Sequence, residues 1–357
     1  MSATGSARNE KTTAKRRTDF GVTMRIWQAL IAALVIAIAP AVARAEVNEL
    51  RIPLGAGGFG FLPLNMMQKY NLIEKYAEEA GLRVTVSWSN IGGPAVMNDA
   101  LLSGSAHFIS AGPPAFLTLW DRTRSNVGVK SIAAISSMPM HLNARVAQLK
   151  SLDDIAGGQK IAVTSIKVSI PSIIMQMYTE KKYGRDQVFR FDPNTVTMAH
   201  PDALIALISG NSAVVGHWAS APYDQRELKD PTIHMIMNSD DVMGGSTTFT
   251  MMSTTTKFQT ENPKVTAAVL KALKQAQEMI VEDKRNAASV LLESMGGKGW
   301  SIDELVEILN DPSTKYTTKP ENVLKYGTFM NKIGSLKNKP TSISDLFFDT
   351  PEVADGN

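Results

Sequence analysis

The chain has 357 residues and contains no cysteine. This absence excludes disulfides, thiol nucleophiles, cysteine-ligated zinc and iron–sulfur clusters. An excess of one charge is also lacking, because the formal net charge is only +3, so bulk charge gives no indication of nucleic-acid binding. With 44% apolar and 20% charged residues, the composition is that of a globular protein, and the length is typical of two domains.

Long apolar runs are lacking everywhere except near the start of the chain. A basic stretch that ends at Arg25 precedes an apolar run over residues 26–43, and residues 43–45 read A-x-A. This order predicts a secretory signal peptide over residues 1–45. A membrane anchor is the alternative, but the run is marginal for a span and holds Pro40 near its end. The sequence leaves open which of two methionines begins the protein, and whether export uses the general or the twin-arginine route.

The charge of the chain changes when the predicted signal is removed. Residues 1–45 contain seven of the 37 Lys and Arg residues and two of the 34 Asp and Glu residues, so the remainder holds 30 basic and 32 acidic residues. No later apolar run is long enough to span a membrane, and no cysteine is present for lipid attachment. We therefore expect a mature protein that is free in the periplasm and does not span the membrane.

After the signal, the pattern strand, Gly/Pro loop, helix repeats three times. Such alternation predicts an α/β fold with a parallel sheet covered by helices. The segment 136–146 is expected to cross into a second α/β run, and 240–256 to cross back with an alternating strand. Helices are expected over 61–81 and through most of the chain after Pro263, and the last residues are expected to be loose. The expected strands are 50–54, 83–88, 106–110 and 129–136 in the first run, and 160–164, 195–198, 212–218 and 233–238 in the second.

The first loop contains the spacing G-x-G-x-x-G at Gly55, Gly57 and Gly60. A dinucleotide site also needs an acidic residue at the end of the following strand, which here ends in Ser-Trp-Ser-Asn. The spacing alone is a weak signal, so we interpret these glycines as part of a different ligand-binding loop.

The loops at the carboxyl ends of the strands predict a ligand cleft. These ends gather at one edge of a parallel sheet, where glycines allow close backbone approach and helix N-termini favour anions. We expect Lys167 to pair with a carboxylate or sulfonate, His217 to donate to an anion, and Trp218 either to stack on a ligand or to fill the core. The four other histidines have no metal-ligand spacing and are interpreted as structural. The predicted ligand-binding residues are Gly58, Phe59, Asn90, Gly92, Gly93, Ser110, Gly112, Pro113, Ser165, Lys167, Ser169, His217, Trp218, Ser246 and Thr247.

Three segments carry a resemblance to a known family: GGPAVMNDALLSGSAHFISAGPPA, LKSLDDIAGGQKIAV and FQTENPKVTAAVLKALKQA. In their order and spacing, they resemble the periplasmic solute-binding proteins of nitrate/sulfonate/taurine-type ABC importers. The resemblance implies a type II periplasmic binding fold, in which two Rossmann-like lobes are joined by two crossover strands around a ligand cleft. Lobe 1 would comprise 46–138 and 248–345, lobe 2 would comprise 139–247, and 346–357 would be a flexible tail. The resemblance also implies that the protein is a monomeric binding protein and not an enzyme, and that it needs no cofactor. It would deliver its ligand to an inner-membrane ABC permease and its ATPase.

The chain departs from the sulfonate pattern directly after the residues KIAV, 160–163. Sulfonate binders usually have a Gly-Ser-Thr-type turn there, whereas this chain has Ser-Ile-Lys-Val-Ser over 165–169. A sulfonate, a carboxylate and an aromatic acid therefore all remain candidate ligands. A TRAP-type transporter or a membrane sensor is the alternative partner. The fungal-type thiamine pyrimidine synthases share the fold but use a cysteine-rich motif that this chain lacks.

Overall fold

The computed structural model describes residues 45–55 and 57–357, so the predicted signal peptide lies, apart from Ala45, outside the described residues. Residues Glu46–Asn357 fold as one unit. Within this described part of the chain, no helix is long and apolar enough to cross a membrane.

Lobe 1 is built on strands from both ends of this unit. Strand β1 (Glu49–Pro53) pairs in parallel with β2 (Thr85–Ser89). Strands β3 (Ile109–Ala111) and β4 (Val129–Ser137) flank β10 (Thr248–Thr255), which runs antiparallel to both. The strand that returns from lobe 2 therefore lies between two strands of the first α/β run, and it ties the two halves of lobe 1 together.

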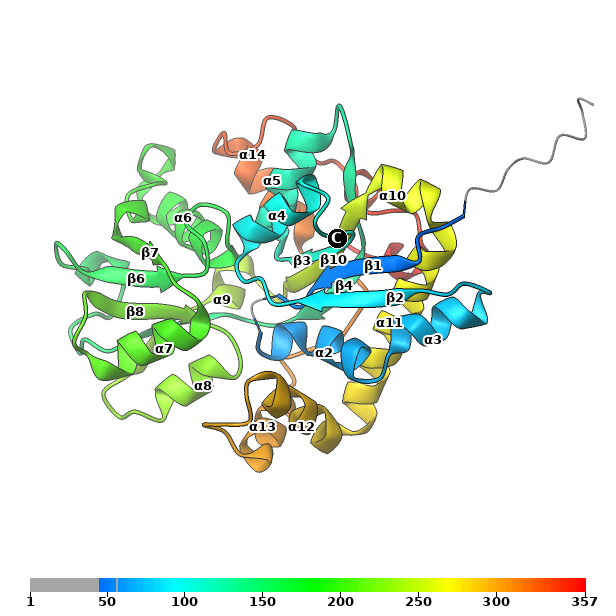
Figure 1. Cartoon of the computed structure of the whole chain (residues 1–357). Helices are drawn as coiled ribbons and strands as arrows, with labels where there is room; N and C mark the ends of the chain where they lie inside the picture. The colour runs from blue at the N-terminus through cyan, green and yellow to red at the C-terminus, as the bar shows by residue number, and fades with distance from the viewer. Residues whose placement is uncertain (1–44, 56) are drawn as a thin grey trace, which may run out of the picture. The chain divides into compact units, whose positions relative to one another are not determined.

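Helices cover this lobe, and Figure 1 shows α11 running beside α2 and α3. The single helix predicted over 61–81 is wrong, because the chain breaks at Asn71, which has a left-handed φ of 48° that asparagine tolerates better than most residues. The helices of lobe 1 are α2 (Leu62–Lys69), α3 (Leu72–Glu79), α4 (Pro94–Leu102), α5 (Pro113–Thr123), α10 (Thr256–Glu261), α11 (Pro263–Glu282), α12 (Lys284–Ser294), α13 (Ile302–Leu309), α14 (Val323–Lys332) and α15 (Ile343–Leu346), with the 3-10 turns η1 (Phe59–Phe61) and η5 (Pro351–Val353).

Lobe 2, drawn in green in Figure 1, contains a five-stranded sheet in the order β7-β6-β8-β5-β9. The inner strand β6 is parallel to β7 and β8, whereas β5 is antiparallel to β8 and β9. The elements are β5 (His141–Ala144), β6 (Lys160–Val163), β7 (Thr195–Thr197), β8 (Val214–Ala219), β9 (His234–Asn238), α6 (Ile170–Tyr183), α7 (His200–Ser209), α8 (Tyr223–Leu228) and α9 (Ser239–Met243), with the 3-10 turns η2 (Leu152–Asp154), η3 (Arg185–Gln187) and η4 (Asp192–Asn194).

Two crossings connect the lobes, one from β4 to β5 through residues 138–140 and one from β9 to β10 through α9 and residues 244–247. The prediction that the returning strand alternates between buried and exposed residues is wrong, because every residue of β10 except Thr255 is buried. The reason is its central position, where neighbouring strands and helices cover both faces. Both crossings lie at the boundary between the lobes, where a small change of backbone angles alters the lobe separation.

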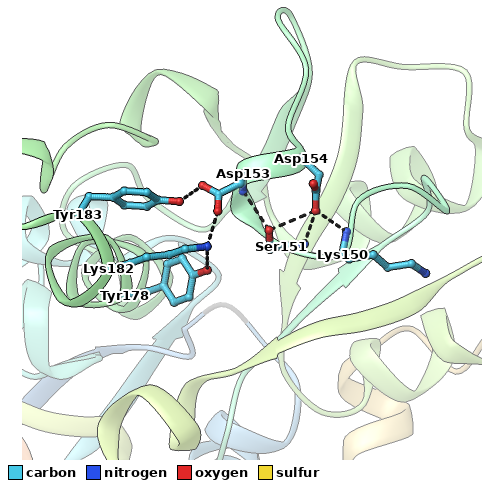
Figure 2. Close-up of polar contacts among 7 residues, drawn as sticks. All are labelled: Lys150, Ser151, Asp153, Asp154, Tyr178, Lys182 and Tyr183. Carbon is cyan, nitrogen blue, oxygen red and sulfur yellow. Dashed lines mark hydrogen bonds and ion pairs between the residues drawn. The ribbon is translucent and has the colours of Figure 1, made fainter.

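The entry into lobe 2 is fixed by a short polar cluster, which Figure 2 shows. The Asp154 carboxylate accepts from the backbone amides of Lys150, at 3.0 Å, and Ser151, at 2.9 Å, and so caps η2. Next to it, Asp153 accepts hydrogen bonds from Lys182 and Tyr183 at the end of α6. The SLDDIAGG segment therefore anchors the start of lobe 2 to the C-terminus of its first helix.

The C-terminal segment is not the flexible tail that the sequence predicts. Phe347 and Val353 are buried, and the backbone amide of Phe348 donates to the carbonyl oxygen of Ser131 on β4 at 3.0 Å. The last residue, Asn357, is held by backbone hydrogen bonds to Pro320 and Val323. The segment is ordered because its apolar side chains complete the core of lobe 1, so the predicted boundary at residue 345 does not mark the end of that lobe.

Candidate functional site

A cavity of about 40 Å³ lies between the two lobes, with room for about three water molecules. Lobe 1 contributes η1, the end of β3, the starts of α4 and α5, and part of β10. Lobe 2 contributes the segment after β6 and the starts of α6 and α7. The pocket is lined by Phe61, Gly93, Pro94, Met97, Ser110, Ala111, Gly112, Met140, Thr164, Val168, Ser169, Ile170, Pro171, His200, Phe249 and Thr250.

Four helices begin at this pocket, α4 and α5 from lobe 1 and α6 and α7 from lobe 2. Gly93, Gly112 and Ser169 are the N-cap residues of the first three helices, and His200 is the first residue of α7. None of the four N-caps closes its helix with a side-chain hydrogen bond. The amide N–H groups of a first helical turn have no acceptor within the helix, and the N-terminus carries partial positive charge; the prolines at the first or second positions of these helices carry no N–H, so the remaining residues of each turn are the donors. The pocket is therefore surrounded by groups that favour an anion.

The hydroxyl of Ser110 is a free donor in this pocket. Ser110 is only 1% exposed, lines the cavity, and its oxygen has no hydrogen-bond partner among the described residues. By contrast, the Thr250 hydroxyl is already engaged, because it donates to the carbonyl oxygen of Gly60 at 2.8 Å. A buried hydroxyl without a partner costs about 1–3 kcal/mol, a cost that a bound ligand removes.

No Lys, Arg, Asp or Glu side chain is among the described residues that line the pocket. The structure places Lys167 outside the pocket wall, exposed on a turn with a φ of 69°. Burial raises the pKa of Asp192 above its ordinary value. The positive charge of Lys167 acts in the opposite direction and lowers that pKa, but its effect is smaller. An anion in this pocket would therefore be held by backbone amides and neutral side chains.

The roles expected of the histidines change in the structure. His217 is completely buried and does not line the pocket; its Nε2 lies 2.9 Å from Nδ1 of His200 and its Nδ1 lies 2.5 Å from Oε1 of Glu227. His200, which the sequence analysis interprets as structural, lines the pocket instead. Burial and the neighbouring His217 hold the pKa of His200 well below its ordinary value, so its ring is neutral. Trp218 is 0% exposed and belongs to the core, the second of the two alternatives considered for it.

Of the predicted ligand-binding residues, the structure brings four together in the pocket wall: Gly93, Ser110, Gly112 and Ser169. Gly58 and Phe59 are buried at a contact between the lobes, and the Ser246 hydroxyl donates to Glu321 at 2.9 Å. Asn90 lines a separate, wider groove of about 860 Å³ that also includes Trp300. Gly92, Pro113, Ser165 and Thr247 are not among the residues that line the pocket.

One signal for His200 was present in the sequence. Each of the four helices at the pocket has a proline at its first or second position, in the segments GGP, GPP, SIP and AHP. Proline favours the first turn of a helix, so the fourth such segment marks a helix start, although α11 also begins with a proline and contributes no residue to the pocket. No group of three or more His, Asp and Glu side chains in the described part of the chain is placed to hold a metal ion.

No protein-family model matches the chain, and no curated protein is similar to it in sequence. The fold is similar to that of the alkanesulfonate-binding protein SsuA from Xanthomonas axonopodis pv. citri bound to MOPS, with 15% identity, a TM-score of 0.64, and coverage of 85% of this chain and 99% of that chain. It is also similar to the periplasmic aliphatic sulphonate-binding protein SsuA from Escherichia coli, with 15% identity, a TM-score of 0.60, and coverage of 87% and 96%. A third similar structure is the periplasmic nitrate-binding protein NrtA from Synechocystis PCC 6803, with 14% identity, a TM-score of 0.61, and coverage of 84% of each chain.

These similarities show that the chain has the periplasmic-binding-protein fold, with two α/β lobes on either side of a cleft. The fold class predicted from the sequence is confirmed. The named neighbours are binding proteins of the sulfonate and nitrate type, the same type that the sequence resembles.

Proposed function

We propose that this chain is an exported solute-binding protein. It captures a small anionic organic ligand in the pocket between the lobes and delivers it to an ABC permease and its ATPase in the inner membrane. The observation that carries this proposal is the meeting of four uncapped helix N-termini with the unpartnered hydroxyl of Ser110 in one buried pocket. The similar structures, which are those of sulfonate- and nitrate-binding proteins, support it.

The pocket fits a group whose negative charge is spread over several oxygens. Backbone amides and the Ser110 hydroxyl offer donors from several directions, which suits the oxygens of a sulfonate, a carboxylate or a nitrate. Phe61, Met97 and Phe249 provide apolar surface for the body of an organic anion. In this proposal the ligand is bound and released unchanged, as in the binding proteins of similar fold.

Capture requires the lobes to move. The cavity of about 40 Å³ is too small for an organic anion to enter the conformation described here without expansion. We infer that the lobes separate about the two crossings, that the ligand enters, and that its contacts with both lobes shift the population towards a closed form. The permease then recognises the closed form.

A thermal-shift screen of residues Glu46–Asn357 tests the proposal. The panel holds ethanesulfonate, taurine, nitrate and benzoate, with uncharged pyrimidines for comparison. An anion at about 100 times its dissociation constant stabilises the fold by about 2.7 kcal/mol, which gives a clear increase in melting temperature. Stabilisation by none of the anions would contradict the proposal.

A pair of glycine variants locates the binding site. In Gly112→Val, the added side chain would collide with Ile170 and with the carbonyl oxygen of Phe249, because a Cβ alone would lie 2.9 Å and 3.1 Å from them. In the control Gly157→Val, no atom lies within 4 Å of the added Cβ. We expect the first variant to lose the anion-dependent shift and the control to keep it. Equal shifts in both variants would place the ligand elsewhere.

The delivery step is tested separately by the neighbouring genes. Genes for an ATPase and a permease beside this one would agree with an ABC importer. A TRAP-type transporter gene or a membrane-sensor gene in their place would redirect the proposal to that partner while leaving the ligand-binding role intact.

A further inference from the structure

Three buried side chains of lobe 2 form a continuous hydrogen-bonded chain that ends at the pocket. Glu227, on α8, lies 2.5 Å from Nδ1 of His217, on β8, and Nε2 of His217 lies 2.9 Å from Nδ1 of His200. Glu227 and His217 are 0% exposed, and His200 is 2% exposed and lines the pocket. Since Nδ1 of His200 faces His217, Nε2 is its remaining ring nitrogen, and no described residue binds it.

Neighbouring groups hold this chain in place. The amide nitrogen of Asn143, on β5, donates to Oε2 of Glu227 at 2.9 Å, so both carboxyl oxygens of Glu227 are engaged. The ring of Tyr223 stacks on that of His200, with 5.4 Å between centroids and 18° between planes. The orientation of His200 relative to the pocket is therefore fixed from two sides.

The other charged groups near this chain form a separate pair. Asp224, on α8, lies 2.7 Å from Nδ1 of His141, on β5, and its charge acts on both His217 and Glu227. The titratable side chain of Tyr223 also contacts His200, and burial raises the pKa of Tyr223. No Lys or Arg of the described chain hydrogen-bonds to Glu227, His217 or His200. The hydrogen-bonded chain of Glu227, His217 and His200 therefore has no cationic partner among the described residues that would compensate the negative charge of a deprotonated Glu227.

Counting protons along the chain fixes what His200 presents to the pocket. When the Glu227–His217 pair carries an additional proton, Nε2 of His217 bears hydrogen whether that proton sits on the carboxyl or on the imidazole. It then donates to Nδ1 of His200, whose own hydrogen must be on Nε2. When the pair loses the proton, Nδ1 of His217 donates to the carboxylate and its Nε2 accepts from Nδ1 of His200. The Nε2 atom of His200 then carries no hydrogen and presents a lone pair to the pocket.

We propose that the Glu227–His217 pair holds one exchangeable proton that determines the polarity of the ligand pocket. With the proton, His200 is a neutral N–H donor and a specificity-determining contact for an oxyanion. Without it, His200 is an acceptor that repels the same oxygens. Glu227 and His217 act as positioning residues through His200. This inference rests on the proposed anion-binding function, because it assigns a role to a side chain in the wall of that pocket.

The burial of the pair indicates where the proton is lost. Burial raises the pKa of Glu227 to about 8, against a smaller opposing effect of the Asn143 hydrogen bond, and burial lowers the pKa of His217. The pair therefore keeps its proton at neutral pH and releases it in the mildly alkaline range. An exported protein experiences the pH of its surroundings, so ligand affinity would follow external pH.

The variant Glu227→Gln separates proton exchange from simple hydrogen bonding. Asn143 donates to the position of Oε2, so the glutamine would place its amide oxygen there and its NH₂ group towards Nδ1 of His217. This arrangement fixes the hydrogen-bond direction of the protonated wild type at every pH. A matched control is His234→Gln, because His234 is another histidine of lobe 2 whose ring contacts the carbonyl oxygen of Leu149 instead of this chain.

The test begins with nitrogen NMR of the histidine rings in ligand-free Glu46–Asn357. We expect His200 of the wild type to carry hydrogen on Nε2 at pH 6.5 and on Nδ1 at pH 9.5, and His200 of Glu227→Gln to keep it on Nε2 at both. A tautomer of wild-type His200 that does not change between these pH values would overturn the inference. This readout needs no ligand and no variant, so it stands even if the anion-binding proposal fails.

The second readout is the affinity for ethanesulfonate, which stays an anion throughout this range. Affinity of the wild type and of His234→Gln should fall by up to about tenfold per pH unit above about pH 8. Glu227→Gln should keep the neutral-pH affinity at pH 9.5. Parallel pH profiles for all three proteins would overturn the inference while leaving anion binding established, whereas absence of ethanesulfonate binding in all three would contradict only a sulfonate ligand in the proposed function.

Discussion

The backbone amide of Phe59, in lobe 1, donates a 3.1 Å hydrogen bond to the carbonyl oxygen of Ala221, in lobe 2. A Cβ on Gly58 would stand 2.9 Å from that same oxygen. The lobes therefore meet backbone to backbone close to Phe61 and Tyr223, which contact the pocket and His200 respectively. This approach depends on a glycine at position 58.

Gly58→Ala should weaken both folding and ligand capture. Its φ of 80° with a ψ of −176° is adopted essentially only by glycine and costs another residue about 1–3 kcal/mol, and the added methyl also pushes the lobes apart at Ala221. We expect a lower free energy of unfolding in urea and a roughly tenfold loss of affinity for the captured anion, equivalent to about 1.4 kcal/mol. Gly81→Ala is the control, since Gly81 has a φ of 77° and open space around its Cβ. It should lose stability but not affinity; equal losses of affinity in both variants would refute the role of this contact.

Ser110→Ala should separate affinity from stability. Its hydroxyl has no partner among the described residues, so its removal leaves the stability of the free protein unchanged or higher. A hydrogen bond to a charged ligand contributes about 1.5–3 kcal/mol, so affinity should fall at least about tenfold. The control Ser131→Ala removes a buried hydroxyl that donates to Met252 at 2.5 Å, and it should lower stability by about 1 kcal/mol without changing affinity. Calorimetry and urea unfolding of both variants give the comparison, and unchanged affinity in Ser110→Ala would place the anion elsewhere.

Glu304 on α13 joins lobe 1 to lobe 2 through Arg226 on α8 and Lys229, the residue that follows this helix. The variant Glu304→Gln keeps the side chain that caps α13 at Ser301 but removes the charge. We expect the ligand-free protein to open, seen as a larger radius of gyration in X-ray scattering, and affinity to fall about two- to fivefold. Asp303→Asn, which breaks an ion pair with Arg285 inside lobe 1, is the matched control and should change neither.

The same ion pairs predict a pH dependence of closure. The hydrogen bond from Lys229, followed by the backbone contact with Ser301, lowers the pKa of Glu304 from 4.5 to about 2. A carboxylate with a depressed pKa stabilises the closed form fully above about pH 4.5 and loses this effect as the pH falls towards 2. The wild type should therefore expand in scattering measurements below pH 4.5, and Glu304→Gln should show a smaller change. Identical acid expansion in both proteins would assign the effect to other carboxylates.

The C-terminal segment should contribute strongly to stability. Phe347 is 1% exposed and its ring lies 6.3 Å from that of Phe116, so Phe347→Ala should cost about 3–5 kcal/mol of unfolding free energy. Phe189→Ala is the control, because Phe189 is 48% exposed and its removal should change stability by less than about 0.5 kcal/mol. Similar melting temperatures for the two variants would show that the segment is loosely attached in solution.

The sequence predicted the architecture because its signals are local. Glycines and prolines mark the ends of strands and the starts of helices, and parallel strands bring these loops to one edge. This reasoning alone placed Gly93, Ser110, Gly112 and Ser169 among the candidate residues that the structure brings together in the pocket wall. The places where the backbone can approach a ligand, and the places where helices begin, depend on where glycine and proline occur in the chain. The sequence gives these positions directly.

Side-chain direction was harder to predict. All six residues of β8 are buried because helices cover both faces of the sheet, so the alternation that normally separates inside from outside does not indicate where His217 and Trp218 point. Lys167 sits exposed on a turn with a positive φ, where its charge acts on Asp192 and where it is not part of the pocket wall. Glu227 on α8 contacts His217 on β8. The sequence does not predict this contact, because it depends on how α8 packs against β8 in the folded lobe.

The most direct test of the central claim is isothermal titration calorimetry of Glu46–Asn357 with ethanesulfonate, nitrate and benzoate, repeated on Ser110→Ala. We expect saturable binding of at least one of these anions with one site per chain, weakened at least about tenfold in the variant. No binding of any anion, or binding that Ser110→Ala leaves intact, would contradict the claim that the pocket between the lobes captures an anion.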